Sequence, residues 1–177
     1  MRWVLLLVVS FLCVACAKSH DITPATLGYE SITPRPDSVF FEVNFSSDVE
    51  LLEIFWREKN ANSFDQVFIC ALGDDTDFSI EHTISKAAMG LITENKKHSK
   101  IAGFGYTASI SFKDVGEKKR TSAYLSRDAI KSLLKDKQKI PCKVVVTATG
   151  YDAYFTRSLF IPVADVFSAL SDYDSLR

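Results

Sequence analysis

Apolar and polar residues alternate along most of the chain after residue 38, a pattern typical of strands that are buried on one side. The clearest case is 101–113, where every second residue is apolar: Phe104, Tyr106, Ala108, Ile110 and Phe112. The positions between them are small or polar: Gly103, Gly105, Thr107, Ser109 and Ser111. Alternating or continuously apolar stretches predict strands over 39–45, 49–57, 64–72, 78–84, 101–113, 119–125, 142–149 and 154–161. Turn signals at short intervals favour antiparallel pairing of these strands.

Two segments have helical spacing instead. Ser126 has the position of a helix N-cap, Asp128 follows in the first turn, and apolar residues continue at helical intervals. A second amphipathic helix is predicted over 163–173, whereas 85–100 fits either a short helix or an apolar strand. The sequence thus predicts a mostly β, α+β domain over 38–177. We expect an antiparallel β-sandwich or barrel-like fold of about eight strands, with one inserted helix and a C-terminal helix.

The acidic cluster 73–77 and His82 are the first candidates for chemistry. Spaced carboxylates can bind calcium, but the spacing of an EF-hand, with its terminal Glu, is absent. We interpret the cluster as a solvated hairpin turn. His82 has no partner motif, which favours a histidine at the edge of the core over a metal ligand or a base.

The first fifteen residues read as an export signal. One positive charge, Arg2, precedes an apolar run that ends in small residues, which is the plan of a secretory signal peptide. The run covers about a dozen residues, and a membrane-spanning helix needs about 20. We therefore assign 1–15 to a cleaved signal.

The tetrad Cys13-Val14-Ala15-Cys16 resembles the lipobox of bacterial lipoproteins. The resemblance covers only this segment, and Cys13 stands where the family usually has Leu. It implies that Cys16 is diacylated and holds the protein on a membrane. Ala17, in place of the Asp that retains such lipoproteins on the inner membrane, implies the outer membrane, facing the periplasm. Ordinary cleavage after Ala17, which would give a secreted soluble protein, is the alternative.

Residues 16–37 have the composition of a flexible tether, because Pro24, Pro34 and Pro36 lie there among polar residues with few large apolar side chains. We therefore expect the lipidated cysteine and a tether over 16–37, and ordered structure from Ser38 onward.

Cys70 and Cys142 are the remaining cysteines, and in an exported protein they are most simply a disulfide. In the chain-entropy model such a bridge would stabilise the fold by about 4 kcal/mol. Two unpaired buried thiols are the alternative. Neither cysteine has a second ligand at zinc spacing, and the three histidines form no motif, so no metal or other cofactor is expected.

Charge and motifs exclude several functions. Arg2 is the only charge of the signal, so the remaining chain holds 20 basic and 22 acidic residues and gives no reason to expect nucleic-acid binding. The sequence has no Gly-x-Ser-x-Gly, no His-Glu-x-x-His and no nucleotide loop. We therefore expect a protein without catalytic activity.

An exported β-domain without catalytic motifs is predicted to bind another envelope protein or a secreted effector. The role could be that of an accessory in secretion or envelope assembly, or that of an immunity protein that inhibits a delivered toxic enzyme. A carrier of a small apolar ligand is a third hypothesis, suggested by the Phe-rich faces. Candidate contact residues are the basic turn and two aromatics: Lys118, Lys119, Arg120, Tyr151 and Tyr154.

Overall fold

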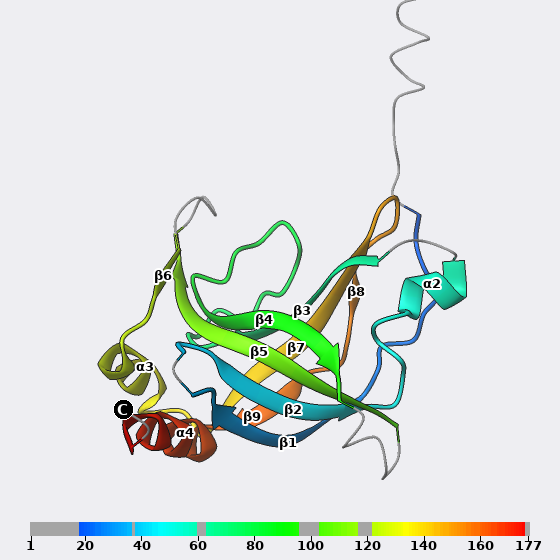
Figure 1. Cartoon of the computed structure of the whole chain (residues 1–177). Helices are drawn as coiled ribbons and strands as arrows, with labels where there is room; N and C mark the ends of the chain where they lie inside the picture. The colour runs from blue at the N-terminus through cyan, green and yellow to red at the C-terminus, as the bar shows by residue number, and fades with distance from the viewer. Residues whose placement is uncertain (1–17, 37, 60–62, 96–102, 117–121, 176–177) are drawn as a thin grey trace, which may run out of the picture.

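The computed structural model of the chain describes residues 18–36, 38–59, 63–95, 103–116 and 122–175 (Figure 1). Within these ranges the strands are β1 Leu27–Pro34, β2 Phe41–Ser47, β3 Ser63–Ala71, β4 Lys86–Glu94, β5 Phe104–Val115, β6 Ser122–Tyr124, β7 Lys139–Ala148, β8 Tyr154–Phe155 and β9 Leu159–Pro162. The helices of the same ranges are α2 Ile54–Lys59, α3 Arg127–Leu134 and α4 Val163–Ser175.

All nine strands belong to one antiparallel sheet, in the order β1-β2-β5-β4-β3-β7-β8. Strand β6 pairs with β5, and β9 pairs with β7. The sheet curls until β1 comes close to β9, and α4 packs against both of these strands (Figure 1). The predicted fold class, a mostly β domain with a barrel-like antiparallel sheet, is confirmed.

The inner face of the curled sheet holds the main core. Phe45 lies between Tyr106 and Phe68, with ring centroids 5.6 and 5.1 Å away. Tyr106 is itself fully buried, and its hydroxyl accepts a hydrogen bond of 2.8 Å from the Leu51 amide. The Phe-rich faces that suggested a ligand carrier are thus used for packing against one another, as buried aromatic side chains usually are.

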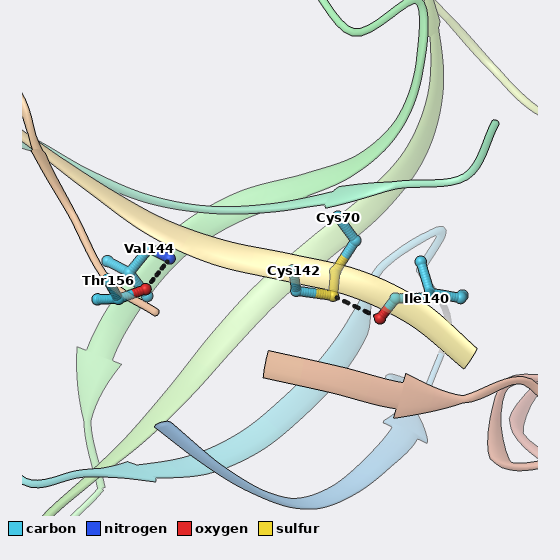
Figure 2. The surroundings of a disulfide bond; sticks show 5 residues. All are labelled: Cys70, Ile140, Cys142, Val144 and Thr156. Atoms are coloured by element: carbon cyan, nitrogen blue, oxygen red, sulfur yellow. Dashed lines mark hydrogen bonds between the residues drawn. A yellow bond between two sulfur atoms is a disulfide. The ribbon is translucent and has the colours of Figure 1, made fainter. Parts of the chain in front are cut away.

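A disulfide joins Cys70 in β3 to Cys142 in β7 (Figure 2). The two residues are direct partners in the register of these strands, with Cα atoms 4.0 Å apart, and both side chains are buried in the core. The predicted disulfide is confirmed. Beside it, the Val144 amide donates to Thr156 Oγ1 at 3.0 Å, which ties the loop between β8 and β9 to β7.

The predicted helices are confirmed with small changes in their ends. Ser126 caps α3, because its Oγ accepts a hydrogen bond from the Ala129 amide at 3.2 Å, and Asp128 lies in the first turn. Helix α4 covers the segment 163–173 that was predicted to be an amphipathic helix and continues to Ser175. The ambiguous stretch after residue 85 is strand β4.

The expected tether is wrong, since it contains strand β1 and is attached to the domain from Lys18 onward. The Lys18 amide donates to the Gly150 carbonyl oxygen at 2.9 Å, and Lys18 in turn accepts from the Asp152 amide at 3.0 Å. The Ala25 amide donates to the buried Tyr154 hydroxyl at 2.6 Å. The start of this segment is therefore bonded to the turn after β7 and to Tyr154, and β1 is paired with β2, which gives the segment a fixed place.

Two predicted strands are absent from the described structure. The segment predicted as a strand over 49–57 includes the start of α2, because Leu51, Ile54 and Phe55 are buried at helical spacing. The segment predicted over 78–84 is an irregular loop. There Phe78 and Ile84 pack inward, whereas Ile80 is exposed. The alternating apolar residues of this segment therefore do not share one buried face, as they would in a strand.

Candidate binding surface

The outer face of the sheet carries an apolar row that crosses four strands. The register aligns Phe155 of β8 with Val145 of β7, Val145 with Val67 of β3, and Val67 with Leu91 of β4. Val145 is buried, Phe155 and Val67 are half-buried, and Leu91 is 61% exposed. Leu91 continues this apolar row out to solvent, which makes this part of the sheet face a candidate for protein binding.

Next to Leu91 the outer face becomes polar, and its side chains are hydrogen-bonded to one another. Asn44 Oδ1 accepts hydrogen bonds from Thr107 Oγ1 at 2.7 Å and from Asn95 Nδ2 at 3.2 Å. Asn95 Nδ2 also donates to Thr107 Oγ1 at 2.9 Å, and Asn44 Nδ2 donates to Ser31 Oγ at 3.1 Å. These side chains form a network across β1, β2 and β5 that would make a polar rim beside an apolar contact.

On the other side of the apolar row, the loop between β3 and β4 folds over the sheet. Its Phe78 and Ile84 belong to a second, smaller core cluster that includes Ile69 and Met89 of the outer face. The loop leaves a cavity of about 340 Å³ between itself and β5, with Lys113 on its far wall. The cavity is within the size range of small ligand sites, about 300–1,000 Å³.

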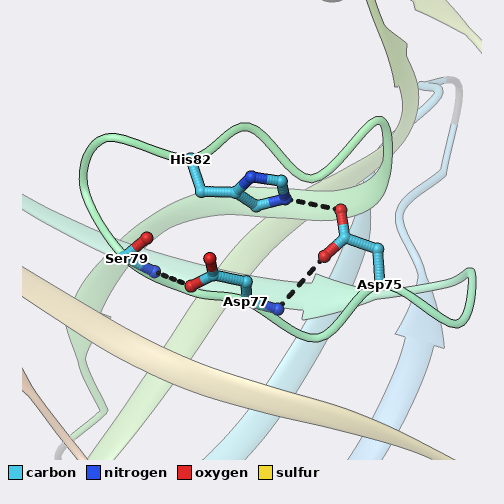
Figure 3. A network of polar contacts seen from close by, with 4 residues as sticks. All are labelled: Asp75, Asp77, Ser79 and His82. Atoms are coloured by element: carbon cyan, nitrogen blue, oxygen red, sulfur yellow. Dashed lines mark hydrogen bonds and ion pairs between the residues drawn. The ribbon is translucent and has the colours of Figure 1, made fainter.

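Carboxylates of this loop hold its shape (Figure 3). Asp75 Oδ1 accepts from the Asp77 amide at 3.2 Å, and Asp77 Oδ1 accepts from the Ser79 amide at 2.9 Å. His82 Nε2 lies 2.6 Å from Asp75 Oδ2 and closes the loop. Asp74 pairs with Lys137 of the segment after α3 at 2.6 Å. These contacts are those of Asx turns and surface ion pairs.

This arrangement does not resemble a metal centre. Among the described residues no group of three or more His, Cys, Asp or Glu side chains is placed to hold a metal ion. The acidic cluster is part of an irregular loop and not of the simple hairpin turn that we predicted. His82 is partly exposed, paired with Asp75, and lines the cavity beside Phe78 and Ile84 of the smaller core cluster.

We expect the pKa of Asp75 to depend on His82. The hydrogen bond from His82 is the main cause that holds the pKa of the Asp75 carboxyl below its usual value of 3.8. The contribution of this carboxylate to stability is therefore complete above that pH and decreases as the pH falls through the lowered pKa. In His82→Ala, an NMR titration of the carboxyl carbons should show the Asp75 midpoint moving up toward the usual value.

Asp74 supplies the control in the same titration. Its pKa is lowered mainly by Lys137, so the Asp74 midpoint should stay the same in His82→Ala. An Asp75 midpoint that does not move would contradict the assigned pair.

The predicted lipidation site, Cys16, and the predicted contact residues divide into three groups. Cys16, Lys118, Lys119 and Arg120 lie outside the described residues. Tyr154 is fully buried, so its proposed role as an exposed contact is wrong. Tyr151 is half-buried, and its ring lies 5.7 Å from that of Phe55.

Leu91 was not singled out from the sequence. It lies in the continuous apolar stretch 87–92, where nothing local marks which side chains face outward. Its exposure follows only from the alternation of β4, in which Ala88 and Ile92 face the core.

In the described part of the chain, no helix is long and apolar enough to cross a membrane. Comparison with known proteins gives no match to a protein-family model, to a curated protein or to a solved structure.

Proposed function

We propose that this chain is a non-catalytic protein of a bacterial cell envelope that is anchored by acyl chains on Cys16 and binds another protein through the outer face of its sheet. The observation that carries the binding role is Leu91, 61% exposed at the end of the apolar row formed with Val67, Val145 and Phe155. The buried Cys70–Cys142 disulfide supports an oxidising compartment, as the export signal also does.

The apolar row suits a protein partner better than a small ligand. Leu91 stands on an open sheet face, and the polar network around Asn44 and Thr107 lies beside it. An apolar centre with a satisfied polar rim is the usual anatomy of a protein interface. The partner is an envelope protein if the chain is an accessory of an envelope machine, and a secreted enzyme if the chain is an inhibitor.

The binding role is tested by copurification of the tagged full chain from solubilised membranes of its source. Leu91→Lys places an ammonium where an apolar contact is proposed, and it should reduce recovery of the partner by about tenfold or more. Val39→Lys is the matched control, because Val39 is also an exposed apolar residue, at 44%, but lies beside α3 and α4. If the partner were recovered equally well with Leu91→Lys and with Val39→Lys, the proposed surface would be refuted.

The anchor is tested in the same preparations by intact mass. The wild type should carry acyl chains on Cys16 and sediment with membranes, whereas Cys16→Ser should lack both the added mass and the membrane association. An unmodified wild-type chain that begins near Lys18 and stays in the soluble fraction would refute the anchor and leave the binding surface as a separate question.

A further inference from the structure

The corrected N-terminal segment fixes which end of the domain would meet a membrane. Both backbone groups of Lys18, its N–H and its carbonyl oxygen, are hydrogen-bonded to the turn around Gly150, which follows β7. Cys16 is only two residues earlier, and two residues span at most about 7 Å. An acylated Cys16 would therefore hold this turn against the bilayer, since only Ala17 separates Cys16 from Lys18 in the sequence.

Helix α2 lies at the same end. Phe55 of this helix contacts both His20 and Tyr151, with ring centroids 5.5 and 5.7 Å away. Figure 1 shows α2 beside the first described residues, far from α3 and α4. The three contacting rings connect α2, the N-terminal segment and the Gly150 turn.

Among the α2 side chains that the structure describes, those of residues 54–56, Trp56 is the exposed one. Its neighbour Phe55 is completely buried, whereas Trp56 is 56% exposed, the most exposed aromatic residue of the described surface apart from Tyr124. Tryptophan is favoured at the boundary between lipid and water, because its ring is apolar and its N–H can still bond. Lys18, whose ammonium lies 5.9 Å from the Tyr151 ring, is also suited to that boundary.

We propose that this membrane-facing end, formed by α2, Lys18 and the Gly150 turn, rests on a lipid bilayer with the Trp56 ring inserted at the headgroup level. The inference rests on the proposed acylation of Cys16. In and beside these segments the sequence places three basic residues, Lys18, Arg57 and Lys59, against four acidic ones, Asp21, Glu53, Glu58 and Asp152, so the end has no excess of positive charge. Contact with zwitterionic lipid is therefore expected, and it should not weaken with added salt as binding to anionic lipid does.

The mature chain contains its own reporter. Trp3 and Trp56 are the two tryptophans of the sequence, and removal of the signal leaves Trp56 alone. When the acylated full chain is reconstituted into phosphatidylcholine vesicles, its Trp56 emission should shift to the blue relative to the same protein before reconstitution. Vesicles made of the brominated lipid should quench most of that emission, at low salt and at high salt alike.

A moved reporter is the matched control. In Trp56→Phe/Val39→Trp the single tryptophan stands beside α3 and α4, at the other end of the domain. Its emission should stay unquenched on the same vesicles, and circular dichroism of both proteins should be the same.

The outcomes separate this inference from the proposed function. A purified chain without acyl mass overturns the anchor and this inference together. An acylated chain whose Trp56 is unquenched, or whose tryptophan at position 39 is quenched equally, overturns the orientation and leaves the anchor standing.

Discussion

Replacing Cys70 with Ala and Cys142 with Val is expected to lower the free energy of unfolding by about 4 kcal/mol. The bridge closes a span of 72 residues, so in the oxidised chain it removes many conformations from the unfolded state. This replacement keeps both positions apolar in a buried part of the core. The measured loss should therefore come mainly from the missing cross-link. A loss of this size is a large part of the 5–15 kcal/mol or so that stabilises a typical domain.

Urea unfolding with and without a reductant measures the effect. The reductant should move the wild-type transition toward that of the double variant and should leave the double variant where it is. A Cys70→Ser/Cys142→Ser chain should be less stable still, by about 1–3 kcal/mol for each buried hydroxyl left without a partner. A double variant within about 1 kcal/mol of the oxidised wild type would show that the cross-link contributes little.

Local patterns predicted the elements whose packing is regular. The alternation of β5 places Tyr106, Ala108 and Ile110 in the core, as expected from the sequence. Ser126 caps α3 because capping involves only the residues next to it. The disulfide could be predicted because the predicted export signal includes or borders Cys13 and Cys16, which leaves Cys70 and Cys142 as the one remaining pair of cysteines.

The missed strand β1 has a physical reason. Its pairing with β2 shifts between Tyr29 and Ser31, so the two buried residues, Leu27 and Ile32, are five positions apart. A bulge of this kind breaks the period of two that identifies a strand. With Pro24, Pro34 and Pro36 nearby, the segment had the composition of a linker although its backbone pairs with the sheet.

The candidate surface could not be predicted because it depends on strand order. Phe155, Val145, Val67 and Leu91 come from four strands that are far apart in the sequence, and only the register makes them neighbours. The proposed orientation toward a membrane depends likewise on two backbone hydrogen bonds at Lys18. Long-range pairing of this kind leaves no periodic signal in a single sequence.

The second large effect is expected at Gly90 in the middle of β4. A Cβ atom on this residue would lie 1.7 Å from the Ser109 carbonyl oxygen and 2.9 Å from the Ile110 Cα, both in the backbone of β5. No rotation of a side chain can relieve such a contact, so the two strands would have to move apart. Gly90→Ala should therefore lower the free energy of unfolding by about 3 kcal/mol, the upper end for an overpacked site.

Gly73→Ala is the matched control, because a Cβ at Gly73 meets no atom within 4 Å. Its stability should stay within about 0.5 kcal/mol of the wild type. Hydrogen exchange adds a second measurement: in Gly90→Ala the amides of β4 and β5 near the pair Gly90–Ile110 should exchange faster, while those of β1 change less. If both glycine variants were equally stable, the close approach of β4 and β5 would not be needed for the curl of the sheet. If only Gly90→Ala is destabilised, this glycine permits the tight bend that brings the aromatic side chains of β2, β3 and β5 together in one core.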